Sequence, residues 1–202
     1  MIHSSQNSKA IFISHAIFRL LDTCVILQEE MEGFYKTASL QKVNGIENIF
    51  KWLHKRGVKI CLYSDLSVTD TQLILDRLNW SISWENDNDS LINLVMAKDE
   101  EVTNPIQHIL DISGAPDPSS VVTFGDTVEF LQWSWQIKSL LNVAVTYGSE
   151  SYRDLAIAPH HGLMDSILEV PNFLLGQFLT LEDDPAKPQE KRRLGMRRPF
   201  FL

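Results

Sequence analysis

Two polar stretches directly follow apolar runs of strand length, and their side chains could bind a cation and an anion. Gly125-Asp126-Thr127 follows the run at 121–124, and Ser64-Asp65 follows the run at 58–63. In open α/β sheets, ligands bind beyond the carboxyl ends of the strands, so both stretches stand where a site would form. A carboxylate at such a place suits a hard cation, and a hydroxyl suits a phosphate oxygen.

Each of these residues also has an ordinary structural alternative. Aspartate is a favoured N-cap, so Asp126 could simply cap the helix that follows it. Ser64 could open a serine turn, which is the commoner outcome for a hydroxyl at a strand end. Both alternatives stay open, and Gly125, Thr127 and Asp65 are the neighbours expected to support either role.

The elements that would position these residues alternate regularly from Val43 onward. Apolar runs of strand length and segments of helical period follow one another, which predicts right-handed βαβ units and a mostly parallel sheet with helices on both faces. The expected strands are 58–63, 91–96, 121–124, 142–146 and a stub at 163–164. The expected helices are 44–56 with Asn44 as cap, 70–78 capped by Thr69 or Asp70, 105–113 closed by Gly114, 128–141, 152–157 capped by Ser151, and 166–178.

Three segments divide the chain. Residues 1–42 form an N-terminal segment with one long expected helix at 17–35, and 43–180 form the α/β core. Residues 181–202 mix proline with charge and lack periodicity, so we expect them to be disordered.

Charge and composition exclude several classes of protein. The 202 residues suffice for one domain without a disulfide or metal staple. Residues 187–202 hold six basic side chains and one acid, so the net charge of −8 leaves the rest of the chain with 12 − 25 = −13. Such an acidic body argues against a nucleic-acid partner. Cys24 and Cys61 lie in apolar runs typical of reduced core thiols, and no run is long enough to span a membrane, so we expect a cytoplasmic protein.

Four stretches, taken in order, resemble the haloacid dehalogenase (HAD) superfamily and, within it, the phosphonatase-like branch. They are NGIE…WLHKRGVKICLYS at 44–64, LDRLNW at 75–80, VVTFGDT at 121–127 and HGLMDSILEVP at 161–171. The resemblance implies a HAD-like Rossmannoid core with a remnant helical cap. It also implies Mg²⁺-dependent hydrolysis through an aspartate nucleophile, with a lysine or arginine that holds the phosphoryl group. Carried over, Ser64 would bind phosphate and Asp126 would bind magnesium.

The sequence departs from the family pattern at three places. The Asp-x-x-Gly-Thr motif after the first strand is absent, since Asp22 is the only aspartate before Val43 and falls inside the expected helix. Asn104 stands at the place of the third-motif cation, with Lys98 several residues away. Phe130 stands at the place of the second acid of the fourth motif, and the adjacent Glu129 would point about 100° away on a helix.

We therefore expect a HAD-like domain that lacks its first strand and is catalytically inactive, acting as an interaction or phosphate-sensing module. The alternative is a Mg²⁺-dependent phosphoric-ester or phosphonate hydrolase whose nucleophile is missing from this sequence or supplied by a partner. The expected partners are a small phosphorylated or phosphonate ligand and a second chain, identical or different, that completes the sheet. The other candidate for the missing strand is the segment 11–13.

Overall fold

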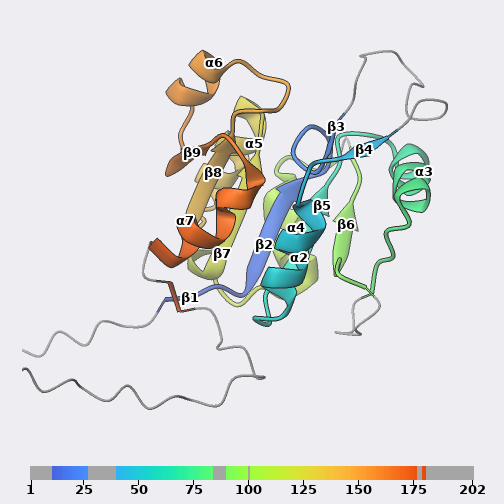
Figure 1. Cartoon of the computed structure of the whole chain (residues 1–202), viewed down its shortest axis with the longest axis horizontal. Coiled ribbons are helices and arrows are strands. Elements are labelled where there is room, and N and C mark those ends of the chain that lie inside the picture. The colour runs from blue at the N-terminus through green and yellow to red at the C-terminus, as the bar shows by residue number, and fades with distance from the viewer. Residues whose placement is uncertain (1–10, 27–39, 84–89, 100, 177–178, 181–202) are drawn as a thin grey trace, which may run out of the picture.

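A six-stranded parallel sheet organises the computed structural model, in the order β6-β5-β2-β7-β8-β9 (Figure 1). The structure describes residues 11–26, 40–83, 90–99, 101–176 and 179–180. The expected tail at 181–202 and most of the expected cap lie outside these residues. The strands are β2 (His15–Arg19), β5 (Lys59–Tyr63), β6 (Leu94–Met96), β7 (Val121–Gly125), β8 (Leu141–Val145) and β9 (Gly162–Met164).

Alternate residues of the central strands face two separate hydrophobic clusters. Phe18 and Leu62 belong to one cluster, whereas Ile17 and Cys61 belong to the other. Because successive side chains of a strand point to opposite faces, both faces of the sheet must be covered, and both are. The predicted α/β class, with a mostly parallel sheet and flanking helices, is confirmed. The helices are α2 (Ile46–His54), α3 (Val68–Leu78), α4 (Pro105–Ser113), α5 (Val128–Gln136), α6 (Tyr152–Ile157) and α7 (Val170–Gly176), with 3-10 turns η1 (Pro118–Ser120) and η2 (Ile167–Glu169).

Two short strand pairs lie outside the main sheet. β1 (Ile11–Phe12) pairs in parallel with β10 (Leu179–Thr180), and β3 (Val25–Ile26) pairs antiparallel with β4 (Gln41–Lys42). No described helix is long and apolar enough to cross a membrane.

The expected helix at 17–35 is wrong over 17–26, because its first residues form the central strand β2, and its remainder at 27–35 lies outside the described residues. All five residues of β2 are buried, and the strand pairs with β5 on one side and β7 on the other. A short apolar run such as Ala16-Ile17-Phe18 has no periodicity that separates a buried strand from a helix. The expectation of a missing first strand is therefore also wrong, and the segment 11–13 does not fill that place.

Several predicted helix ends differ from the observed ones. Gly45 with φ 85°, not Asn44, is the N-cap of α2, and Ser67 caps α3 by accepting from the Asp70 N–H. The helix expected at 128–141 ends at Gln136, close to Lys138 with its positive φ of 57°. The caps at Ser151 and Gly114 are as predicted.

Candidate functional site

The candidate site lies where β2, β5 and β7 end at one edge of the sheet. Arg19 is the last residue of β2, Ser64 and Asp65 directly follow β5, and Asp126 directly follows β7. Because β2 runs between β5 and β7 in parallel register, Arg19 reaches the loops that follow both neighbours. The two stretches singled out in the sequence therefore meet, and an arginine that the sequence analysis missed joins them.

The Arg19 guanidinium is buried among acidic side chains. Its Nη1 donates to Asp126 Oδ1 at 2.8 Å and to the Leu21 carbonyl at 3.1 Å, and its Nη2 donates to Asp65 Oδ2 at 2.6 Å. Asp22 Oδ2 lies 3.9 Å from Nη1. Burial by itself would lower the pKa of Arg19, but the carboxylates of Asp126 and Asp65 outweigh that effect and raise it. Arg19 is thus a permanent cation at this edge.

The Asp126 carboxylate is fully buried and saturated by donors from the chain itself. Oδ1 accepts from Arg19 Nη1 and, at 2.9 Å, from Thr23 Oγ1. Oδ2 accepts from the Ser149 N–H at 2.9 Å and from Ser149 Oγ at 2.8 Å. Since Thr127 and not Asp126 caps α5, the N-cap alternative for Asp126 does not hold.

A glycine allows the loop after β8 to approach Asp126 this closely. A Cβ on Gly148 would overlap the Cβ and carboxyl carbon of Asp126. The neighbouring Ser149 supplies both of its donors to Oδ2 from this loop. The surroundings of Asp126 are therefore built around the carboxylate itself, with no room beside Gly148.

Magnesium, which the family resemblance implies, does not fit these residues as they are arranged. Mg²⁺ needs carboxylate lone pairs and near-octahedral oxygen ligands, but each Asp126 oxygen already accepts two hydrogen bonds. The guanidinium also brings a fixed positive charge against Oδ1. In the part of the chain that the structure describes, no three Asp, Glu, His or Cys side chains are grouped so that they could hold a metal ion.

Ser64, the expected phosphate-binding residue, is fully buried and takes part in local hydrogen bonds. Its Oγ lies 2.8 Å from Thr71 Oγ1, which donates to it, and it accepts from the Leu66 N–H at 3.3 Å. The second bond is that of a serine turn, the structural alternative considered for this residue. Thr71 lies on α3, so Ser64 ties the end of β5 to that helix.

Asp65 adds negative charge next to Ser64. Its side chain is 39% exposed, yet its Oδ1 atom is buried and accepts no hydrogen bond from the described residues. Burial, followed by the charges of Asp65 and Glu129, raises the pKa of Tyr63 to about 12. Asp65 and Asp126 against Arg19 give these three side chains a formal charge of −2 + 1 = −1. A phosphate anion would be repelled here.

The two other positions that depart from the family pattern have structural roles. Asn104 caps α4, accepting from the N–H groups of Ile106 and Gln107, and its Nδ2 donates to the Trp133 carbonyl at 3.2 Å. Phe130 is fully buried, and a Cβ on Gly125 would overlap its ring. The exposed alternatives, Lys98 after β6 and Glu129 on α5, are in no contact with Asp126 among those observed.

Arg19 and Thr23, which the sequence analysis missed, belong to a sequence pattern that can be recognised once β2 is known to be a strand. The five residues Arg19-Leu20-Leu21-Asp22-Thr23 have the spacing of Asp-x-x-Gly-Thr at the end of a strand, with arginine in the first place and threonine kept in the last. Thr23 is buried and donates to Asp126. The first place of this pattern is therefore present in the chain, and it is occupied by an arginine.

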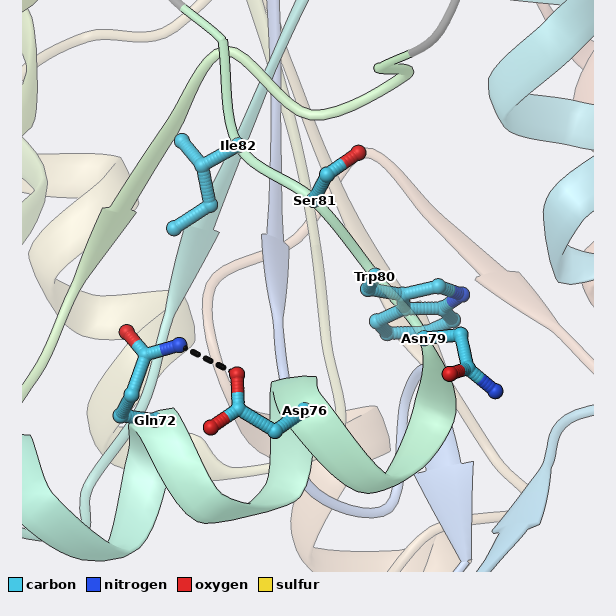
Figure 2. Close-up of a pocket in the computed structure, with 6 residues that line it drawn as sticks. All are labelled: Gln72, Asp76, Asn79, Trp80, Ser81 and Ile82. Carbon is cyan, nitrogen blue, oxygen red and sulfur yellow. Dashed lines mark hydrogen bonds between the residues drawn. The ribbon is translucent and has the colours of Figure 1, made fainter.

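A hollow of about 530 Å³ lies at the end of α3, away from this cluster. Within it Gln72 Nε2 donates to Asp76 Oδ1 at 2.7 Å (Figure 2). None of the residues that line it belongs to the strand-end cluster: they are Gln72, Asp76, Asn79, Trp80, Ser81 and Ile82.

Comparisons with known proteins show which fold carries this site. No family model matches the sequence, and no curated protein matches it significantly. Solved structures do match: a haloacid dehalogenase-like hydrolase from Streptococcus pneumoniae is 12% identical, with a TM-score of 0.62 over 80% of this chain and 98% of that one. The fold is HAD-like.

Two further structures support the HAD-like fold. A predicted phosphatase from Clostridium acetobutylicum is 12% identical, with a TM-score of 0.64 over 82% of this chain and 99% of that one. A haloacid dehalogenase-like protein of unknown function from Agrobacterium tumefaciens is 11% identical, with a TM-score of 0.61 over 82% and 99%. At such identities the likeness establishes the HAD-like fold alone.

Proposed function

We propose that this chain is a HAD-like domain that does not hydrolyse phosphate esters or phosphonates and acts as an interaction module. One observation carries the proposal: Arg19, at the end of the central strand, stands where the Asp-x-x-Gly-Thr pattern places its nucleophilic aspartate. Covalent catalysis through this position needs a carboxylate that attacks the phosphorus atom. A guanidinium has no lone pair available for that attack at any physiological pH.

A second feature supports an inactive site. The cation of the third motif has no counterpart at Asn104, which is committed to capping α4. Removing a group that stabilises a developing charge typically lowers a rate by about 10²–10³-fold. The net negative charge of Asp65, Asp126 and Arg19 also argues against phosphate sensing at Ser64, so interaction with a macromolecule is the better supported of the two non-catalytic functions.

An exposed aromatic side chain supports the interaction role. Trp135 on α5 is 48% exposed, and its ring lies 5.1 Å from that of His161. Trp133, two residues earlier, instead packs edge-on against Tyr63 at 5.5 Å. Trp133 is thus partly buried against the core, whereas Trp135 lies on the surface, where tryptophan is typical of protein interfaces.

The test is hydrolysis of p-nitrophenyl phosphate by the purified full chain with Mg²⁺, beside an Asp126→Asn control. We expect both proteins to release p-nitrophenol at the same background rate. Turnover that requires Asp126 would overturn the proposal and favour the Mg²⁺-dependent hydrolase. Calorimetry with inorganic phosphate is expected to be flat, whereas Ser64-dependent binding would favour a phosphate sensor.

A further inference from the structure

We infer that a hollow beside Trp80 binds a small monocarboxylate whose apolar body is a single ring or a branched chain of similar size. The hollow measures about 200 Å³ and lies between α2, the end of α3 and the residues before β6. It is lined by Glu47, Phe50, Lys51, Asn79, Trp80, Ser81, Leu91 and Ile92. None of these residues belongs to the strand-end cluster, so this inference can fail while the proposed function holds, and the reverse.

The first step is the apolar wall of the hollow. Phe50 and Ile92 are buried, with 1% and 2% exposure, and the ring centres of Phe50 and Trp80 are 5.7 Å apart. Leu91 is partly buried against the same core. An apolar cavity of about 150 Å³ is large enough to hold benzene, so this hollow admits one ring together with a short polar substituent. The wall therefore favours a ligand with a compact apolar body.

The second step is the fixed position of Trp80. Its Nε1 donates to Glu47 Oε1 at 2.9 Å, and Lys42 Nζ, which lies 5.5 Å from the centre of the Trp80 ring, also donates to Glu47 Oε1. Hydrogen bonds from Lys42 and then from Trp80 lower the pKa of Glu47, so its carboxylate is charged at neutral pH and is paired with Lys42. The indole is thus held by contacts within the chain, and the wall of the hollow is formed without a ligand.

The third step is the charge at the rim of the hollow. Lys51 lies one turn after Glu47 on α2, is exposed, and belongs to none of the ion pairs between described residues. Since Lys42 already neutralises Glu47, the three side chains have a formal charge of +2 − 1 = +1, in a chain whose net charge is −8. Asn79 adds an exposed amide at the C-cap of α3, next to Trp80 (Figure 2). A carboxylate can accept hydrogen bonds from both the ammonium and the amide.

The experiment is an NMR titration of the full chain with phenylacetate, followed through the indole N–H signal of Trp80. A Trp80→Phe variant assigns that signal among the five tryptophans. We expect a saturable shift with a dissociation constant of about 1 mM or below, the range for a ligand of about ten heavy atoms. Phenylacetamide, which has the same shape without the charge, should bind about three- to fivefold more weakly, as expected for the loss of an exposed ion pair. The cation 2-phenylethylamine should bind more weakly still.

Three variants test the roles of the lining residues. Lys51→Gln should weaken phenylacetate binding by the same factor of about three to five and leave phenylacetamide binding unchanged. Lys55→Gln, which removes an exposed lysine at the C-cap of the same helix and outside the hollow, is the matched control and should bind like wild type. Leu91→Trp should fill the hollow and abolish binding of both compounds.

Four results would overturn the inference. The first is a Trp80 signal in wild type that does not shift saturably at about twentyfold above the expected dissociation constant. The second is binding of phenylacetamide, 2-phenylethylamine or inorganic phosphate at least as tight as that of phenylacetate. The third is equal behaviour of Lys51→Gln and Lys55→Gln, and the fourth is a folded Leu91→Trp variant that still binds phenylacetate.

Discussion

The ion pair between Arg19 and Asp126 should be strongly coupled in stability, and a double-mutant cycle measures this. The two atoms that meet are 2.8 Å apart, and the side chains of Arg19 and Asp126 are 9% and 0% exposed. At an effective dielectric constant of about 20, that distance corresponds to about 6 kcal/mol of direct attraction, most of which offsets the cost of removing both charges from water.

The expected values follow from that balance. Arg19→Met keeps much of the aliphatic stem but leaves Asp126 buried and unpaired, so the free energy of unfolding should fall by about 3–5 kcal/mol. Asp126→Asn keeps the shape of the side chain and should lower it by about 2–4 kcal/mol. In the double variant neither charge is stranded, so the combined loss should be smaller than the sum by about 2–3 kcal/mol.

Urea unfolding at pH 7 with EDTA, followed by tryptophan fluorescence, measures all four proteins. A second cycle with Asp65→Asn provides the matched comparison, because Asp65 is 39% exposed and its pairing is screened by water. We expect a coupling of at most about 1 kcal/mol there. A coupling below about 0.5 kcal/mol for Asp126, or a larger one for Asp65 than for Asp126, would refute the electrostatic reasoning.

Three further predictions concern other parts of the fold. Burial lowers the pKa of His15 from 6.5 to about 4. The unfolded chain therefore binds a proton first, and about 3 kcal/mol of stability should be lost as the pH falls between those values. Urea unfolding at pH 7 and pH 4.5 checks this, and His15→Gln should weaken the pH dependence. Gly125→Ala should lower the unfolding free energy by about 1–3 kcal/mol through overlap with the Phe130 ring, whereas Gly176→Ala, with open space around it, should change it by less than 1 kcal/mol. Asn104→Ala removes the α4 cap and should cost about 1–2 kcal/mol by the same assay, and an unchanged midpoint would contradict the capping role.

The sequence predicts the sheet well from β5 onward because the signals there are local. Gly114 and Ser151 end and begin helices, and the apolar runs that became β5, β7 and β8 are short and continuous. Positions that depend on contacts distant in sequence are harder to predict. Gly45, and not the neighbouring Asn44, is the N-cap of α2. A Cβ at position 45 would overlap Leu168, which is distant in sequence.

In the candidate site, too, the residues with local signals could be predicted and those that depend on distant contacts could not. Ser64 and Asp126 could be placed at the sheet edge because each follows a recognisable strand. Arg19 could not, because a charged residue that ends a short apolar run is more typical of a helix face than of a buried strand end. The carboxylates that make its burial tolerable lie 46 and 107 residues further along the chain. A local pattern carries no information about partners at that distance.

The place of β2 in the sheet also sets the order in which the chain can fold. Of the six strands of the main sheet, β2 comes first in chain order, and its two neighbours in the sheet end at Tyr63 and Gly125. During synthesis β2 can pair with β5 once residue 63 is made, but its second neighbour, β7, is complete only at residue 125. Domains dominated by such long-range pairings fold slowly. Until β7 and the residue after it are made, Arg19 lacks its buried partner Asp126. We expect this domain to depend on chaperones more than its size suggests.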